Sequence, residues 1–232
     1  DAQARLRGAV ELAHVLGVDT VVTMSGCPGG RGGTDTTGVF ALWSTCCDDE
    51  PLFAHQMATE LLPFWRETSR WAATAAPGVR ICLELHPGVT IYNAAGYLAL
   101  AEATGPNVLV NLDPSHFWWQ GIDPQRVVEA LSGRIGFAHG KDTLLHPDRI
   151  ALHGVLDWRF PVDPETAAWH FAAVGEGHDD ATWAALLGAI RDAGHDGVVS
   201  IEHEDPRYSG EEGVERSLAG LRRALDLLGG GA

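Results

Sequence analysis

The sequence predicts an α/β fold of the (β/α)8 TIM-barrel type, with the first three strands of the barrel apparently lacking from this chain. Strand-like apolar runs alternate with helix-like segments along the 232 residues, and this alternation predicts a parallel sheet covered by helices. Only five strand-like runs occur and the chain opens on a helix, whereas a closed barrel has eight strands in ~250 residues. An open, doubly wound sheet is the alternative fold.

In the amino-terminal half, apolar periodicity predicts three helices and three strands. Leu6, Val10 and Ala13 share one face of a helix, and the β-branched run that follows is typical of a strand. A helical pattern from residue 52 is expected to break at Pro63. In order, the predicted elements are the helix 2–16, the strand 20–24, a glycine-rich loop over 25–38, the helix 52–76, the strand 79–85, the helix 93–104 and the strand 107–113.

In the carboxyl-terminal half, Asp123 followed by Pro124 is typical of an N-cap and the first helical position. Residues 142–180 are rich in Pro, Trp and His and have no clear period. A stripe from Val214 to Leu225 marks the last helix as amphipathic. The predicted elements are the helix 123–131, the strand 134–139, the helix 181–193, the strand 197–202 and the helix 211–228.

Composition narrows the class of protein. A net charge of −15 argues against nucleic acid and anionic membranes as partners. We expect one barrel domain over residues 1–232, N-terminally incomplete since the chain starts without Met. We find no apolar run long enough for a membrane span and no signal-peptide pattern, and the cysteines (Cys27, Cys46, Cys47 and Cys82) form no C-x-x-C pair. Reduced thiols and a cytoplasmic location follow as expectations.

Four polar residues stand at the carboxyl ends of apolar runs, and they carry most of the functional information. They are Glu84, Asp113, His139 and Glu202. Because side chains alternate along a strand, each of them can point inward while its apolar neighbours face the helices. The carboxyl ends of barrel strands converge on one pocket, so we expect these four side chains to meet.

The alternative is that these groups are solvated charges at strand ends. Three carboxylates in one pocket would repel each other strongly unless a cation neutralised them. A set of two glutamates, one aspartate and one histidine suits Mn²⁺, Mg²⁺ or Zn²⁺ better than a metal that prefers thiolates. The four together therefore predict a metal site.

Neighbouring residues are candidates for substrate binding. They are His86, His116, Lys141, Asp142 and His178. Lys141 could bind an oxyanion and Asp142 could orient the site, although a plain salt bridge explains both equally simply. His116 and His86 have structural alternatives, as does the loop that carries Glu176 and His178. The pair Trp118-Trp119 is more often packing than a wall for a sugar ring.

The chain resembles the sugar phosphate isomerase/epimerase superfamily, the xylose-isomerase-like TIM barrels. The matching motifs are E-L-H-P at 84–87, N-L-D-P-S-H at 111–116, H-G-K-D at 139–142 and S-I-E-H-E-D at 200–205. The resemblance implies that the last four strands each supply one metal ligand, namely Glu84, Asp113, His139 and Glu202. It further implies that Glu84 and Glu202 act as the catalytic acid/base pair and that His116 contacts substrate.

This resemblance implies a divalent-metal-dependent isomerase or epimerase that acts on a sugar, sugar phosphate or related polyol through an enediolate. Mn²⁺ is the expected metal, with Mg²⁺, Co²⁺ and Zn²⁺ as alternatives. An inosose-type dehydratase or a catalytically impaired metal-binding paralogue would share the same motifs. The apurinic-endonuclease branch would need more metal ligands and a basic face for DNA, which the charge disfavours. Open sheet edges would also allow a homo-oligomer.

Overall fold

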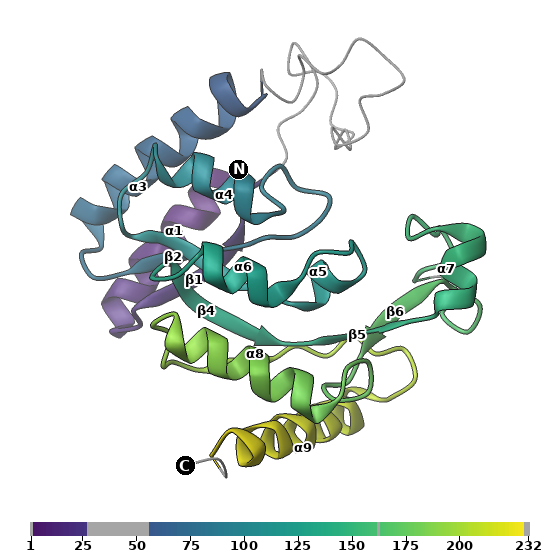
Figure 1. Ribbon diagram of the computed structural model, residues 1–232. Helices are drawn as coiled ribbons and strands as arrows, with labels where there is room; N and C mark the ends of the chain where they lie inside the picture. Colours follow the sequence, from purple (N-terminus) through teal and green to yellow (C-terminus); the bar gives the residue numbers. More distant parts are fainter. Residues whose placement is uncertain (1, 27–55, 162, 230–232) are drawn as a thin grey trace. The chain divides into compact units, whose positions relative to one another are not determined.

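The structure is a computed structural model that describes residues 2–26, 56–161 and 163–229 (Figure 1). The chain falls into two compact units, Asp1–Asn111 and Leu112–Ala232. The boundary lies within strand β3, Val108–Leu112, so that this strand begins in the first unit and ends in the second. Each unit is described in turn.

The first unit is built around parallel strands. β1 (Thr20–Met24) pairs with β2 (Arg80–Glu84), and β2 pairs with β3, so that Glu84 stands opposite Asn111. Helix α1 (Ala2–Leu16) packs against β1 and against α3 (Leu62–Ala75). The remaining helices of this unit are the π-helix η2 (Met57–Leu61) and α4 (Ala94–Ala101).

Buried side chains tie this sheet to its helices. Trp65 of α3 is almost fully buried and donates its indole N–H to the carbonyl of Ser25 at 2.9 Å. Tyr97 of α4 is fully buried and donates its hydroxyl to the Val108 carbonyl at 2.9 Å. Because Ser25 follows β1 and Val108 begins β3, these two aromatic residues satisfy polar backbone groups at the sheet while filling its core.

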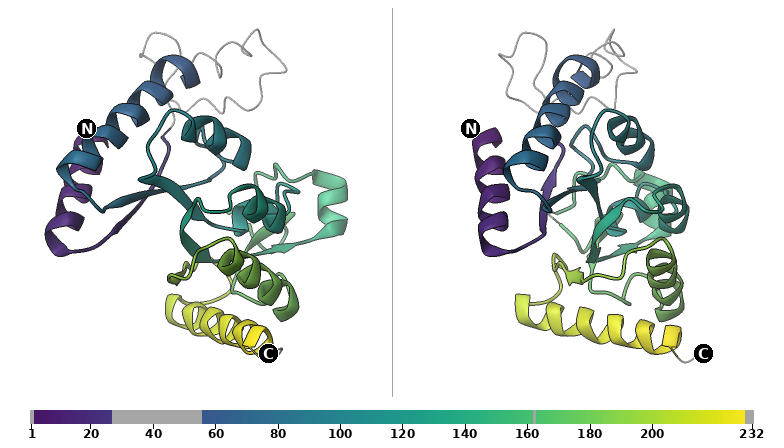
Figure 2. Two further views of the ribbon diagram at one scale, coloured as in Figure 1. Left: turned by 60° about the vertical axis from the view of Figure 1, so that its left-hand side comes forward. Right: turned by 90° about the vertical axis from the view of Figure 1, so that its left-hand side faces the viewer.

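The second unit combines a parallel strand pair with an antiparallel one. β4 (Ile135–Gly140) pairs with β7 (Val199–Ile201), whereas β5 (Asp142–Leu145) pairs with β6 (Trp169–Ala172). Helices α8 (Asp180–Asp192) and α9 (Gly210–Gly229) lie side by side, and α9 also packs on β7 (Figures 1 and 2). The shorter helices are α5 (Ser115–Trp118), α6 (Pro124–Ala130) and α7 (Pro147–His153).

The five predicted strands are confirmed as β1, β2, β3, β4 and β7. At Pro63 the structure contains a change of helix type rather than a break, because the π-helix η2 ends at Leu61 and α3 begins at Leu62 with the backbone helical at both residues. The Leu62 amide donates to the Met57 carbonyl, so the wider π-helical turn leads directly into the proline. Asp123 caps α6 as predicted, accepting a hydrogen bond from the Gln125 amide at 2.9 Å.

Residues 142–180 contain structure that the sequence did not predict. They hold β5, β6 and α7, elements too short to establish an apolar period. The one-turn helix α5 was missed for the same reason. Most of the predicted glycine-rich loop lies outside the described residues, because residues 27–55 are not described.

Within the described ranges, no helix is both long enough and apolar enough to cross a membrane. Cys82 is a free thiol buried in β2, and burial raises its pKa to about 12. The other three cysteines lie outside the described residues. A cytoplasmic location, a single domain and a homo-oligomer stay predictions.

Gly220 of α9 is expected to tolerate no larger side chain. A Cβ built there would stand 2.0 Å from the carbonyl oxygen of Val174, a backbone atom that cannot rotate away. Gly220→Ala should therefore destabilise the protein by about 2 kcal/mol, as overpacking typically does. Denaturant unfolding followed by circular dichroism would measure the change.

Gly229→Ala is the matched control, because it lies in the same helix and its added Cβ meets no atom within 4 Å. This control should change the free energy of unfolding by less than about 0.5 kcal/mol. Equal stability of the two variants would show that α9 does not press against the Val174 carbonyl.

Candidate metal centre

Three of the predicted metal ligands meet in the second unit. Asp113 follows β3, His139 lies in β4 and Glu202 follows β7. Each offers one ligand atom, and these atoms lie within 4.8 Å of one another. The Nδ1 atom of His139 lies 2.8 Å from Oε2 of Glu202 and 3.4 Å from Oδ2 of Asp113.

The strand register explains why His139 and Glu202 meet. In the parallel pair of β4 and β7, His139 stands opposite Ser200 and Gly140 opposite Ile201. Side chains alternate, so Ser200 and Glu202 project to the same side as His139. The carboxyl ends of the adjacent parallel strands β4 and β7 thus bring the His139 imidazole and the Glu202 carboxylate together.

Asp113 is held by a local turn as well as by the cluster. Its Oδ1 atom accepts hydrogen bonds from the Ser115 amide at 2.9 Å and from the Ser115 hydroxyl at 2.6 Å. Burial alone would raise the pKa of Asp113, but the His139 hydrogen bond and the charges of His116 and Lys141 lower it well below its usual range. Asp113 is therefore an ionised carboxylate with Oδ2 directed at the cluster. Ser115 was not singled out from the sequence, although its place two residues after an aspartate is typical of such a turn.

Glu202 provides the test of whether the cluster fits a metal ion. Its Oε1 atom lies 3.1 Å from the Lys141 ammonium and accepts a hydrogen bond from it. Its Oε2 atom is buried and accepts no hydrogen bond of acceptable geometry from the described residues, although His139 Nδ1 is close. A buried carboxylate oxygen without a donor is costly, and a cation bound beside His139 and Asp113 would satisfy it. The donor set of these residues fits a divalent metal.

Glu84 and His86 belong to the first unit. Glu84 is the last residue of β2, and its Oε2 atom accepts a hydrogen bond from the Asn111 side-chain amide at 3.4 Å. Asn111 is its register partner and lies two residues before Asp113 in the chain. The ring nitrogen Nδ1 of His86 contacts the carbonyl of Pro87.

Lys141 is fully buried and forms the salt bridges that the sequence left open as an alternative. Its ammonium pairs with Glu202 at 3.1 Å and with Glu204 at 2.5 Å, and it lies 4.0 Å from the centre of the Phe171 ring. Burial would lower the pKa of Lys141, but the charges of Asp113, Glu204 and Glu202 raise it overall. A permanently charged lysine therefore fixes one oxygen of Glu202 and leaves the other facing His139.

His116 is a buried residue of α5 rather than a histidine of a surface loop. Its Nε2 atom lies 3.6 Å from Oδ2 of Asp113, and its ring meets the edge of Phe171 with centroids 5.5 Å apart. The sequence spacing Asp113-x-x-His116 places both residues on the same turn, which explains their proximity.

Asp142 is held by contacts within the second unit, and its predicted contact with substrate stays a prediction. It is fully buried, and its oxygens accept backbone hydrogen bonds from Thr143, Gly175, Gly177 and His178 at 2.8 to 3.2 Å. The Trp183 indole and the His178 ring complete its contacts at 2.9 and 2.7 Å. These six contacts engage both oxygens of Asp142. Asp142 thereby positions the segment 174–178 and the start of α8.

His178 is held between this carboxylate and an aromatic face. Its Nδ1 atom lies 2.7 Å from Asp142 Oδ1, and its ring stacks on Trp118 with centroids 3.9 Å apart. Trp118 also meets the edge of Trp183. The packing alternative for Trp118 is therefore what the structure contains, and His178 keeps a fixed ring orientation with only Nε2 uncommitted to Asp142.

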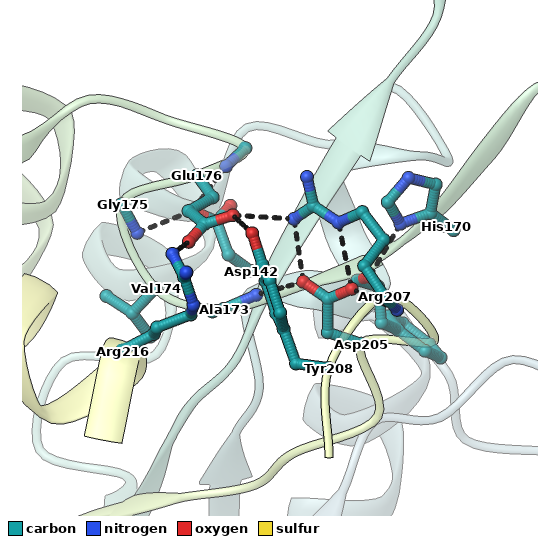
Figure 3. Close-up of polar contacts among 12 residues, drawn as sticks. Asp142, His170, Ala173, Val174, Gly175, Glu176, Asp205, Arg207, Tyr208 and Arg216 are labelled. Atoms are coloured by element: carbon teal, nitrogen blue, oxygen red, sulfur yellow. Dashed lines mark hydrogen bonds and ion pairs between the residues drawn. The ribbon is translucent and has the colours of Figure 1, made fainter. Parts of the chain in front are cut away.

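A second polar network surrounds Glu176 and was not predicted (Figure 3). Glu176 accepts hydrogen bonds from Arg207 and Tyr208 at 2.9 Å and from Arg216 at 3.0 Å. Arg207 also holds Asp205 through two parallel contacts of 2.9 and 2.7 Å. Glu176 is thereby bound within the protein, so it does not serve as a residue that closes over substrate. The pairing joins segments distant in the chain, and no local sequence signal could reveal it.

The chain belongs to the xylose isomerase-like TIM barrel family, whose model matches residues 1–224. It is similar to the uncharacterized protein YfiH of Bacillus subtilis strain 168, with 33% identity over 221 residues that make up 93% of this chain and 69% of that protein. The fold class predicted from the alternating elements is thus confirmed.

Solved structures show the same fold. The probable 3-DHS dehydratase AsbF of Bacillus anthracis matches with a TM-score of 0.62 and 17% identity, over 94% of this chain and 68% of that one. L-ribulose 3-epimerase matches with a TM-score of 0.56 and 18% identity, over 96% and 68%. The IOLI protein with a bound zinc atom matches with a TM-score of 0.61 and 20% identity, over 97% and 69%. At these identities the likeness concerns the fold.

Asp142→Asn is expected to loosen the segment 174–178. The NH₂ group of the asparagine would face N–H groups that are themselves donors. The negative charge that these donors now surround would also be lost. The expected cost is about 3 kcal/mol, as for breaking other buried charged contacts. Thermal unfolding would measure the stability, and hydrogen exchange at Gly175, Gly177 and His178 would locate the loosening.

Asp192→Asn is the control, because Asp192 is an exposed residue at the end of α8 that pairs only with Arg191 among the described residues. It should leave both measurements unchanged. Slow, unaltered exchange of the three amides in Asp142→Asn would contradict the positioning role.

Proposed function

We propose that this protein is a divalent-metal-dependent isomerase or epimerase of a sugar, sugar phosphate or related polyol. The observation that carries the proposal is the cluster of Asp113, His139 and Glu202, whose ligand atoms lie within 4.8 Å of one another, with Nδ1 of His139 2.8 Å from Oε2 of Glu202. Membership of the xylose isomerase-like family and the likeness to an epimerase in fold support the reaction class.

We propose Glu84, Asp113, His139 and Glu202 as the metal ligands. Glu84 is included because it ends β2 and its register partner Asn111 leads directly to Asp113. Mn²⁺ is the metal we favour for this oxygen-rich set, and the zinc of a structural neighbour makes Zn²⁺ a competitor to be tested. A divalent cation would supply Lewis-acid polarisation of a substrate carbonyl and its neighbouring hydroxyl.

The proposed proton carriers are Glu84 and Glu202. One glutamate removes the proton from the carbon next to the carbonyl, and the other returns a proton to the same carbon or to its neighbour. Return to the same carbon from the opposite face gives epimerisation, and return to the neighbouring carbon gives isomerisation. The Lys141 ammonium donates to Glu202 Oε1 and so fixes the orientation of this carboxylate. Glu202 would therefore transfer the proton from a fixed position.

The proposed substrate contacts are His86, His116, Lys141 and His178. His116 is buried beside Asp113, and His178 is fixed by Asp142 and Trp118. Their ring N–H groups suit the hydroxyls of a polyol. Asp142 completes the proposed set, and it also holds the ring of His178.

Dehydration of a cyclic polyol or related keto acid is the second candidate. The likeness in fold to a protein described as a 3-DHS dehydratase favours it. Its first step would be the same proton removal by a glutamate, and the outcome differs only in the loss of a hydroxyl from the adjacent carbon.

Metal binding is the first measurement. The purified chain should bind Mn²⁺ with a stoichiometry of one, and Asp113→Asn should weaken that binding at least about tenfold, because a buried anionic ligand is replaced by a neutral one. Isothermal titration would give both values. Asp192→Asn should bind like the unaltered chain, and equal affinity in Asp113→Asn would remove Asp113 from the ligand set.

Catalysis is the second measurement. A panel of ketoses, ketose phosphates and inososes should be assayed with Mn²⁺, Mg²⁺, Co²⁺ and Zn²⁺. Glu84→Gln and Glu202→Gln should each lower kcat roughly 100-fold or more, the usual contribution of acid/base catalysis. Glu129→Gln, at an exposed position of α6, should retain full activity. Full activity in either active-site variant would rule out the acid/base pair, and product analysis would separate epimerisation from dehydration.

A further inference from the structure

A cleft lies in the second unit, on the β5–β6 pair. Its volume is about 380 Å³, within the range of sites for small molecules. Its lining includes Leu144, His146, Arg149, Glu165, His170 and Arg207. None of the proposed metal ligands or substrate contacts lines it.

The strand register places this cleft on the opposite face of the pair from the metal ligands. In the antiparallel register, Thr143 stands opposite Phe171 and Leu144 opposite His170. Opposed residues project to one face, and the next pair projects to the other. Phe171 contacts Lys141 and His116 beside the metal ligands, so Leu144 and His170 face away from them.

The cleft is locally basic in an acidic protein. Two arginines and two histidines line it against a single glutamate, although the chain as a whole carries a net charge of −15. Burial and the positive charges of Arg149, His170 and Arg207 lower the pKa of His146. The charges around His146 thus disfavour its protonated form, a situation that an anion in the cleft would relieve.

Both arginines of the cleft are held in place, and each keeps N–H groups that make no hydrogen bond to the described residues. Arg149 donates Nη1 to the Ala167 carbonyl at 2.9 Å, and among the described residues its Nε and Nη2 atoms have no partner. Arg207 is fixed through Nε and Nη2 by Asp205 and Glu176, which leaves Nη1 without a partner in the described part of the chain. Glu165 forms no ion pair with either arginine in the described ranges. Fixed guanidinium groups with unused N–H donors are suited to bind an oxyanion.

We propose that this cleft binds a phosphate group of a small molecule, at a site separate from the metal ligands. A phosphate presents three acceptor oxygens and up to two negative charges, which match donors from Arg149, Arg207 and His146. The Nδ1 atom of His170 contacts the Phe171 carbonyl at 2.7 Å. A carboxylate has only two oxygens and one charge, so it would leave part of this basic lining unmatched. The site does not depend on the reaction proposed above.

Isothermal titration of the purified full chain with inorganic phosphate tests this site. Saturable binding is expected, and Arg149→Gln should weaken it at least about tenfold, the loss of one charge-assisted contact. His146→Gln is a second variant that leaves the Ala167 contact intact, and it should weaken binding several-fold. Arg126→Gln, at an exposed position of α6, is the matched control and should not change the affinity.

Two further titrations distinguish phosphate binding in this cleft from binding at the metal ligands and from binding of any small anion. Asp113→Asn should bind phosphate as tightly as the unaltered chain, because the proposed site lies on the other face of the strand pair. Acetate should bind at least about tenfold more weakly than phosphate. Absence of saturable phosphate binding, or unchanged affinity in both Arg149→Gln and His146→Gln, would overturn the site. Loss of binding in Asp113→Asn would assign the phosphate to the metal ligands, and equal acetate affinity would overturn the phosphate assignment.

Discussion

Compensation of buried carboxylates is the constraint on which the second unit depends. Asp113, Asp142 and Asp205 are all buried, and each carries a charge that would be costly without partners. The chain meets this cost in different ways. Asp142 is surrounded by donor N–H groups, Asp205 is held by Arg207 and the Ala173 amide, and Asp113 depends on Ser115 and the imidazoles near it.

The hydrogen-bond partners of Asp142 and Asp205 differ from those of Glu202. Both oxygens of Asp142 and both oxygens of Asp205 accept hydrogen bonds, and these bonds hold the loop 174–178 and the turn after β7. Glu202 is compensated on one side only, since Lys141 takes Oε1 while Oε2 faces His139 without a hydrogen-bond donor of acceptable geometry in the described ranges. A half-satisfied carboxylate calls for a further partner, and a bound cation would supply one here.

The sequence predicted the parallel strands well because each is a run of apolar residues that ends in a polar one. Glu84, Asp113, His139 and Glu202 could be found because their positions depend only on strand alternation and strand ends. The contacts of Asp142 could not be found, since five of its six partners come from the backbone or rings of a segment more than 30 residues away. For the same reason the sequence could not reveal that Glu176 pairs with Arg207. Short elements such as β5 and β6 also give no period, because Trp169, His170 and Phe171 are all buried.

Because both faces of the β5–β6 pair are buried, this pair contributes residues to both proposed sites. Phe171 supports Lys141 and His116, and through Lys141 it bears on the orientation of Glu202. His170, the preceding residue, lines the basic cleft, so a single strand contributes to both. Arg207 repeats the pattern after β7, because it lies five residues beyond Glu202 and also lines the cleft. Alternating strand geometry thus places neighbouring residues of one strand beside two different sites, one on each face of the strand pair.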